Sequence, residues 1–154
     1  MATQTTYPDI AAAAVVGAQA TMRDADIVSR AVETAAGIAF GSPVMQGTAD
    51  KQVGFFTAGT VYGVAMLDRS AVGLNPATGV IADDTFGLNE SARIMVKGDI
   101  WLTAAVAVAA GDPVYVRPSN GTWQNDATNS GVLVVGARWD TSAAIAGLAV
   151  AHFG

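Results

Sequence analysis

The sequence contains no cysteine, which excludes disulfide bonds, thiol nucleophiles and zinc sites built on thiolates. Charged side chains are scarce, at 14% of 154 residues, and eight Lys and Arg face thirteen Asp and Glu. With a net charge of -5 the chain has no basic patch for phosphate groups, so we expect no nucleic-acid partner and no electrostatic membrane binding. The lack of cysteine also fits assembly in a reducing cytoplasm.

Long hydrophobic runs are missing as well. The longest apolar stretches, residues 10–18 and 143–151, have nine residues each, against the ~18 that a membrane-spanning helix needs. Arg23 is the first positive side chain, so no basic region precedes the first apolar stretch. We therefore expect neither a membrane segment nor a secretion signal.

The abundant residues are small or β-branched, with 31 Ala, 19 Val and 17 Gly, whereas aromatic residues make up 7% of the chain. The length predicts one domain with at most an additional arm. High apolar content with little charge excludes disorder of the whole chain. A surface with so few charges also suits a protein that packs against other proteins.

Turn-forming residues recur from Gly41 onward at intervals of about 8 to 12 residues. This spacing is typical of β-sandwiches and barrels, whose short strands alternate apolar and polar side chains. We therefore predict a mainly β protein, with a small antiparallel β-sandwich or barrel of jelly-roll-like form over residues 28–154. Residues 1–27 are predicted to form an extended N-terminal arm.

Strand alternation gives more local predictions. In residues 93–97, Ile94 and Val96 share one face, and a short hairpin loop at Gly98 is expected to lead into residues 100–103.

The second half of the chain shows the same alternation. The pair Asn120-Gly121 predicts a hairpin, because both residues tolerate the positive φ that tight β-turns require. Val114 and Val116 are expected to face inward. Strands are predicted over residues 113–117, 132–135 and 148–153.

The N-terminal segment has two interpretations. Asp9 is a suitable helix cap, and the Ala-rich residues 10–16 have helix propensity, which Gly17 weakens. No charged side chain lies between Ile10 and Met22, so a helix here would lack a strong amphipathic face. This absence favours an arm laid extended over a neighbouring molecule.

Residues suited to catalysis are few. His152, the only histidine, lies two residues from the C-terminus, where a general base would be poorly held. The pairs Asp24/Asp26 and Asp83/Asp84 lie in loop-like sequence without a matching second acid. We therefore expect no catalytic residue, cofactor or metal site; the enzyme alternative is a small hydrolase that uses His152 or Asp83-Asp84.

Aromatic side chains raise a glycan-binding alternative, because rings of Trp101, Trp123, Trp139, Tyr62 and Tyr115 could stack on sugars. Strand phase places Trp101 and Tyr115 opposite inward-facing aliphatic residues, so both are predicted to be partly exposed. On a surface with little charge, large exposed rings more often mark a contact with another protein.

A series of short motifs follows along nearly the whole chain. The first half contains Tyr7-Pro8-Asp9-Ile10, Ser29-Arg30, Phe40-Gly41-Ser42-Pro43-Val44 and Gln46-Gly47-Thr48-Ala49-Asp50. The second half contains Lys97-Gly98-Asp99-Ile100-Trp101, Ala110-Gly111-Asp112-Pro113-Val114-Tyr115-Val116, Val135-Gly136-Ala137-Arg138-Trp139 and Gly147-Leu148-Ala149-Val150. In their order and spacing these motifs resemble the structural cement (decoration) protein family of tailed bacteriophage capsids.

This resemblance implies a β-rich, non-enzymatic protein on the outer surface of a phage head, assembled in the bacterial host cytoplasm, where it clamps coat subunits together. The partners it implies are the major capsid protein and neighbouring copies of the chain, arranged as a dimer or trimer, with no nucleic acid and no membrane. The alternative is a glycan- or surface-binding head protein. The residues expected to make the contacts are Tyr7, Ile10, Val15 and Val16 in the arm, and Trp101 and Tyr115 in the domain.

Overall fold

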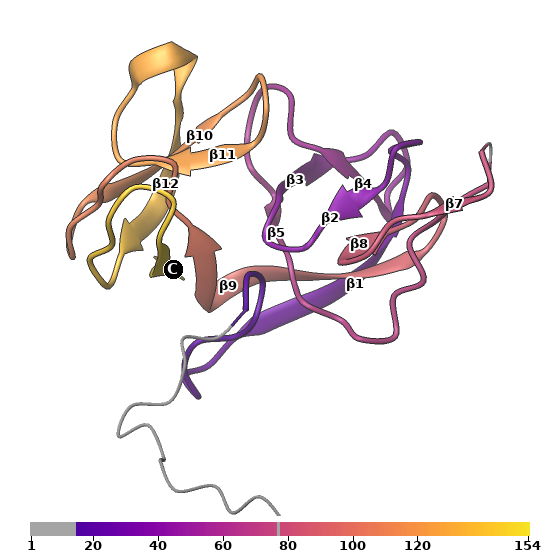
Figure 1. Cartoon of the computed structure of the whole chain (residues 1–154), viewed down its shortest axis with the longest axis horizontal. Helices are drawn as coiled ribbons and strands as arrows, with labels where there is room; N and C mark the ends of the chain where they lie inside the picture. The colour runs from indigo at the N-terminus through magenta and orange to yellow at the C-terminus, as the bar shows by residue number, and fades with distance from the viewer. Residues whose placement is uncertain (1–14, 77) are drawn as a thin grey trace, which may run out of the picture.

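Short strands dominate the computed structural model, which describes residues 15–76 and 78–154 (Figure 1). The mainly β fold is confirmed, and the helical structure within the described residues is limited to the 3-10 turn η1 (Thr128–Ser130). The strands, in chain order, are β1 (Asp26–Val32), β2 (Ile38–Ala39), β3 (Pro43–Gln46), β4 (Gln52–Phe55), β5 (Gly63–Ala65), β6 (Leu74–Asn75), β7 (Val80–Ile81), β8 (Thr85–Phe86), β9 (Ser91–Thr103), β10 (Pro113–Arg117), β11 (Thr122–Gln124), β12 (Val132–Trp139) and β13 (Leu148–Phe153).

The long strand β9 belongs to two halves of the molecule (Figure 1). Residues 91–97 pair with β1 and β5, and β4 and β3 complete the ring β1-β4-β3-β5-β9, here termed the N-lobe. Residues 98–103 pair with β13, which is followed by β12, β10 and β11; this half is the C-lobe. A bridge between Ala104 and Trp123 brings β11 back to the end of β9. The strand pairs are antiparallel except β1–β4, which is parallel, so the sheet is mixed.

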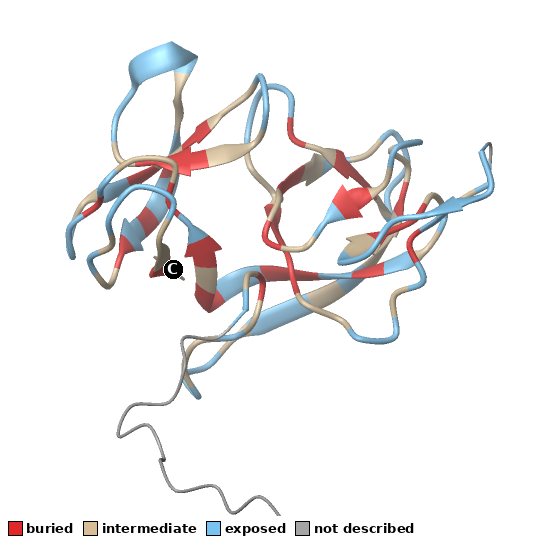
Figure 2. Cartoon of the chain, in the orientation of Figure 1, coloured by how far each residue is buried: buried red, intermediate tan, exposed pale blue. Residues whose placement is uncertain are grey.

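Each lobe has its own hydrophobic core (Figure 2). The two cores form because alternate residues of β9 and its neighbours turn inward in each lobe. The N-lobe core consists of Val32, Ile38, Val44, Val53, Ala65, Phe86, Ala92 and Ile94. The larger C-lobe core contains Ile100, Leu102, Val114, Val116, Trp123, Trp139, Ala149, Ala151 and Phe153, and it reaches across the junction to Phe56, Met66 and Met95.

The hairpin loop predicted at Gly98 is wrong, although Gly98 has the expected positive φ of 129°. The strand β9 continues through this residue and exchanges β1 and β5 for β13 as its neighbours. A Cβ at this position would lie 2.9 Å from Cβ of Ala25, so only glycine fits the bend. Gly98 therefore redirects one strand from the N-lobe to the C-lobe.

The inward position predicted for Val96 is also wrong. The β1–β9 register shifts between Asp26 and Ile27, which pair with Lys97 and Met95, so Val96 forms a β-bulge. Val96 is 38% exposed, whereas Met95 is buried in its place. A bulge changes the face to which following residues point, and a strict two-residue period cannot anticipate it.

The local predictions for the C-lobe are confirmed. Gly121 has a φ of 66°, and its N–H donates to the carbonyl of Arg117 at 2.8 Å, closing the β10–β11 hairpin. Val114 and Val116 are fully buried. The predicted strand over residues 148–153 matches β13, and the strand predicted over residues 132–135 forms the first half of β12.

Part of the predicted arm packs on the domain. Gly17 N–H donates to the carbonyl of Trp101 at 2.8 Å, Trp101 N–H to that of Ala18 at 2.9 Å, and Ala20 N–H to that of Asp99 at 2.8 Å. These bonds and a bridge between Gln19 and Ile100 add residues 17–20, here termed the arm root, to the edge of β9. Residues 1–14, which contain most of the alternative helix over residues 10–16, lie outside the described residues. Asp26 and Ile27, the last two residues of the predicted arm, belong to β1.

Candidate functional site

The most organised polar cluster lies where the arm root, β9 and β13 meet. Asp99, at the bend of β9, is 1% exposed, and its Oδ1 lies 2.6 Å from Nδ1 of His152. Thr21 Oγ1 donates to Oδ2 of the same carboxylate, and Nη1 of Arg23 lies 3.7 Å from that oxygen. The cluster therefore connects a residue near the C-terminus to the segment that leads out of the arm.

Asp99 is held in its charged form. Burial raises its pKa, but the hydrogen bonds from Thr21 and His152, together with the charges of His152 and Arg23, outweigh burial and lower the pKa below its ordinary value. An ionised carboxylate can only accept hydrogen bonds, so Nδ1 of His152 is the donor in this pair. The cluster is a hydrogen-bonded polar network around one buried carboxylate, and it holds neighbouring segments in one arrangement.

This geometry does not assemble a hydrolase site. In a Ser-His-Asp arrangement the hydroxyl bonds to the imidazole, which removes its proton, whereas Thr21 bonds to the carboxylate. Asp83 and Asp84 are exposed on the surface. Within residues 15–76 and 78–154, no group of three or more potential ligand side chains could hold a metal ion.

In the described part of the chain, no helix has the length and hydrophobicity needed to cross a membrane.

The aromatic residues do not form one sugar-binding face. Trp139 is fully buried and Trp123 is 3% exposed, with its Nε1 donating to the carbonyl of Gly41 at 2.7 Å. The Tyr62 hydroxyl accepts a hydrogen bond from Arg30 at 2.9 Å. The glycan hypothesis is therefore wrong for the two buried tryptophans, which belong to the C-lobe core.

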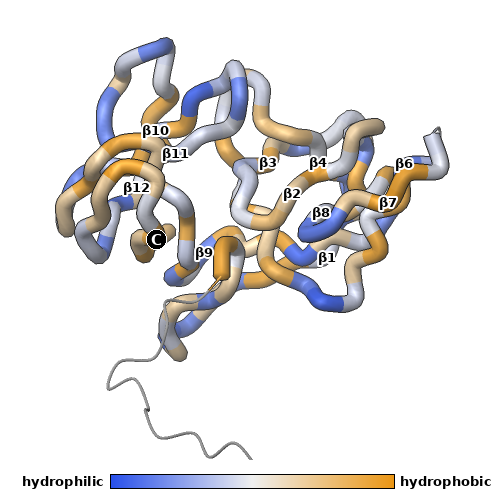
Figure 3. The backbone as a smooth tube through the Cα atoms, in the orientation of Figure 1, coloured by the Kyte–Doolittle hydropathy of each residue, from blue (hydrophilic) through white to orange (hydrophobic). Residues whose placement is uncertain are grey.

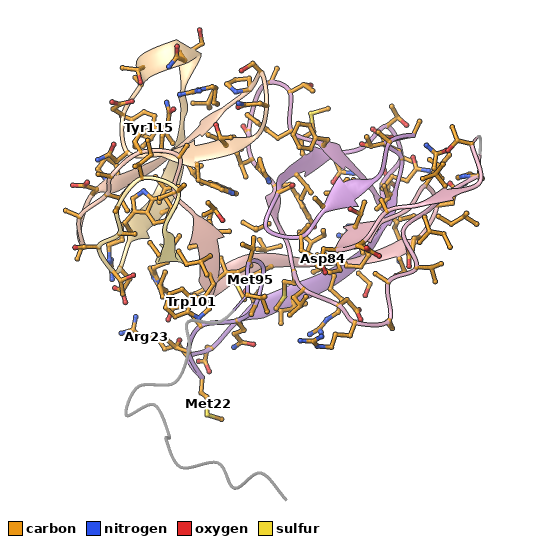
Figure 4. All side chains as sticks on the ribbon, in the orientation of Figure 1. Met22, Arg23, Asp84, Met95, Trp101 and Tyr115 are labelled. Atoms are coloured by element: carbon orange, nitrogen blue, oxygen red, sulfur yellow. The ribbon has the colours of Figure 1, made fainter. Side chains whose placement is uncertain are left out.

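Trp101 and Tyr115 are both partly exposed, as strand phase predicted, but they lie in different places (Figure 4). Trp101 pairs with Val150 of β13 on one side and hydrogen-bonds the arm root on the other. Tyr115 lies opposite Leu133 in the β10–β12 pair. The structure therefore does not bring the two predicted aromatic contacts together.

Tyr115 belongs to an apolar surface of the C-lobe. Directly opposed residues share a sheet face, so Tyr115 and Leu133 lie together, and Val135 follows two residues later on β12. Leu133 is 47% exposed and Val135 is 88% exposed. These three residues are here termed the C-lobe patch. Strand alternation in the sequence predicted the exposure of Tyr115. It did not predict the exposure of Leu133 and Val135, because this depends on which face of β12 turns outward.

The predicted arm contacts divide into two groups. Tyr7 and Ile10 lie outside the described residues. Val15 is 55% exposed at the start of the described chain, whereas Val16 is half-buried against Gly41, which has no side chain to obstruct it.

A further set of exposed apolar residues lies on the β6–β7 hairpin and was not singled out from the sequence: Val72, Leu74, Val80 and Ile81. The available signal was the absence of any charged residue between positions 70 and 82.

Comparison with known proteins adds an independent line of evidence. Residues 3–153 match the family described as "Structural cement protein (E217 gp24/Pam3 gp6)". Curated proteins include no match to the sequence.

Two solved structures match the chain, of which the first shares its fold. One, described as "The capsid of Myoviridae Phage XM1", has a TM-score of 0.68 at 15% identity and covers 99% of this chain and 97% of that one. The other, described as "The crystal structure of head fiber gp8.5 N base in bacteriophage phi29", has a TM-score of 0.46 at 10% identity, with 84% and 95% covered. The family match spans almost the whole chain, and this protein therefore belongs to the structural cement protein family of phage capsids, as a non-enzymatic component of the virion that binds the head.

Proposed function

We propose that this protein binds the outer surface of the assembled shell and contacts the major capsid protein there. The family match over residues 3–153 carries the proposal. Binding only to the assembled lattice stabilises that lattice by mass action, because every occupied site adds its binding free energy to the assembled state. Many weak contacts summed over a shell give a large effect without a tight individual complex.

The C-lobe patch supports an apolar mode of contact. Only 21 of the 154 side chains carry a formal charge, and exposed ion pairs contribute about 0–1 kcal/mol each. The partly exposed Tyr115 instead lies opposite the exposed Leu133, and the exposed Val135 follows on the same strand as Leu133. Aromatic residues with an apolar surround are the residues that most often dominate protein interfaces. We propose Tyr115 as an anchor of the capsid contact, with Trp101 as a second anchor.

The arm supplies the other proposed contact. Within the proposed arm of residues 1–27, the part that precedes the arm root is proposed to reach a neighbouring subunit through Tyr7, Ile10, Val15 and Val16, with residues 28–154 as the domain. The arm root supports this role because its hydrogen bonds to β9 hold the base of the arm at a defined place. Neighbouring copies of the chain, as a dimer or trimer, are proposed to meet on the lattice.

The test is quantitative binding of labelled protein to heads prepared without it, from about 0.05 to about 1 M salt. Apolar contacts predict occupancy that survives high salt, whereas release at moderate salt would show that charge holds the complex. Tyr115→Ala and Trp101→Ala should each weaken binding by about 2 kcal/mol, with a smaller effect on melting of the free protein. Deletion of residues 1–14, which retains the arm root, tests the arm separately.

The matched control is Ile145→Ala, because Ile145 is 70% exposed but belongs to neither the arm nor the C-lobe patch. This variant should bind like the unchanged protein. Loss of binding in Ile145→Ala equal to that in Tyr115→Ala would place the contact elsewhere. Undiminished binding by the truncated chain would exclude Tyr7 and Ile10 from the contact.

A further inference from the structure

The β6–β7 hairpin projects from the N-lobe at the end of the molecule away from the C-lobe (Figure 1). It comprises residues 71–76 and 78–82, here termed the finger, and its two strands pair only with each other within the described chain. An isolated two-stranded hairpin is marginally stable in water, so a finger of this kind needs support from its base or from a partner. The structure shows the support at its base.

Glu90 fixes the base of the finger. Its carboxylate accepts backbone hydrogen bonds from Val72 at 2.6 Å, Gly73 at 3.1 Å and Gly87 at 2.7 Å. Gly87 also allows the backbone of Leu74 to approach closely, because a Cβ at Gly87 would clash with that backbone. The finger is thus presented in a defined orientation before any partner binds, which reduces the entropy lost on binding.

One face of the finger is apolar and exposed. Leu74 lies opposite Ile81 in the hairpin, and Val72 lines the same surface depression as Leu74. Their exposed fractions are 43% for Leu74, 62% for Ile81 and 57% for Val72. The strand β7 is exposed in Figure 2 and hydrophobic in Figure 3. Uncharged and apolar exposed surface of this kind is typical of a protein contact site.

The small size of this face indicates which partner it fits. Three partly exposed side chains form a small patch, whereas a stable complex of two free proteins buries about 800 Å² and roughly 20–30 residues on each partner. A second free copy would therefore not be held by the finger alone. A smaller contact is sufficient when the protein is already bound to the shell at another place. The first contact then holds the finger close to the shell, which gives the second contact a high effective concentration.

We propose that the finger is a second capsid contact, in which Val72, Leu74 and Ile81 pack into an uncharged apolar surface of the coat protein. This inference rests on the proposed function. The C-lobe patch and the finger lie on different lobes, with Tyr115 on the lobe opposite the hairpin (Figure 4). Each protein molecule therefore holds the shell at two separated places, which is the arrangement that lets one molecule bridge neighbouring parts of a lattice.

The decisive comparison is between Ile81→Ser and Ile145→Ser, which remove the same side chain at 62% and 70% exposure. Labelled variants would be titrated onto heads prepared without the protein. Ile81→Ser should weaken binding ~10-fold and raise the dissociation rate, whereas Ile145→Ser should bind within about twofold of the unchanged protein. Combined with Tyr115→Ala, the loss should multiply, because the two contacts are separate.

Thermal melting of each variant checks that it is folded before binding is compared. If unchanged protein binds heads and Ile81→Ser binds equally well, the finger proposal is overturned and the proposed function stands. If unchanged protein does not bind heads, the proposed function itself fails. Sedimentation of the free protein tests self-association. If the unchanged protein self-associates and Ile81→Ser does not, the finger binds a second copy of the chain, and the proposed capsid contact is overturned.

Discussion

The N-lobe and the C-lobe share β9 but differ in how they are built. The C-lobe is formed by β10 to β13, which follow one another in the sequence, and its core contains two buried tryptophans and Phe153. The N-lobe core is smaller, and two of its large members, Ile38 and Phe86, come from the two-residue strands β2 and β8. The C-lobe is therefore the more continuous half, whereas the N-lobe supports the projecting finger.

This difference teaches where binding surfaces arise in a small β protein. The C-lobe strands are joined by short connections, residues 104–112, 118–121, 125–131 and 140–147, so this lobe offers a sheet face as its contact. A lobe closed by short strands leaves long connections, and one of these forms the finger, fixed at its base by Glu90. The proposed contact of the C-lobe is thus a sheet face, the C-lobe patch, and the proposed contact of the N-lobe is a projecting connection, the finger.

The largest expected effect tests whether the lobes unfold as one unit. Trp139→Ala empties the C-lobe core and should cost about 3–5 kcal/mol of unfolding free energy, because Trp139 is fully buried. Since β9 belongs to both lobes, the N-lobe should lose protection at the same denaturant concentration. Hydrogen exchange of β3 and β13 during urea unfolding measures both halves.

The matched N-lobe change is Phe86→Ala, which removes a side chain with 1% exposure. In this variant too, both lobes should unfold in a single transition during urea unfolding. Retention of N-lobe protection after loss of the C-lobe would show instead that the lobes are independent domains joined by a strand.

A smaller effect is expected at the junction of the lobes. Asp99→Asn removes the charge that Thr21 and His152 hydrogen-bond, and should cost about 2–3 kcal/mol at neutral pH. Because folding lowers the pKa of Asp99, its stabilisation is present above the ordinary value of 3.8 and is lost as pH falls through the lower folded pKa. Urea unfolding at pH 7 and in stronger acid should show the two proteins converging as the pH falls.

Asp24→Asn is the control for this change, because Asp24 is exposed in the same N-terminal segment. It should leave stability within about 0.5 kcal/mol of the unchanged protein. An equal loss in both variants would mean that net charge, rather than the buried cluster, determines the effect.

The arm root provides the next effect in size. Gly17 has a φ of 81°, and a Cβ there would lie 2.9 Å from the backbone nitrogen of Leu67. Gly17→Ala should therefore cost about 1–2 kcal/mol and detach residues 17–20 from β9. Amide exchange at Ala20 and Trp101 reports this detachment directly.

Gly59→Ala separates backbone strain from the clash, because Gly59 has a similar φ of 84° and nothing within 4 Å of an added Cβ. It should leave the exchange of Ala20 and Trp101 unchanged. Faster exchange there in Gly59→Ala would mean that the arm root responds to general destabilisation.

The smallest expected effect concerns Arg23, whose side chain is 58% exposed and lies 3.7 Å from the Asp99 carboxylate. Arg23→Gln should change stability by less than about 0.5 kcal/mol, because an exposed guanidinium is screened by water and salt. Melting at low and high salt measures the difference. A loss as large as that of Asp99→Asn would show that the cation, rather than Thr21 and His152, holds the cluster.

Short-range patterns in the sequence determined the β class, the β10–β11 hairpin, the last strand and the inward positions of Val114 and Val116. Turn propensity and strand alternation depend on neighbouring residues, so they can be recognised in the sequence without knowledge of the fold. The absence of cysteine and the shortage of charge exclude whole classes of chemistry in the same way, because side chains that are not in the chain cannot act in any fold.

Tertiary structure decided the features that depend on distant residues. Thr21 and His152 meet Asp99 across 78 and 53 positions of sequence, and no local pattern marks such a meeting. The bulge at Val96 and the passage of β9 through Gly98 follow from which strands close each lobe. The exposure of Val135 and Ile81 has the same origin: an apolar side chain looks alike in sequence whether a neighbouring element covers it or leaves it free.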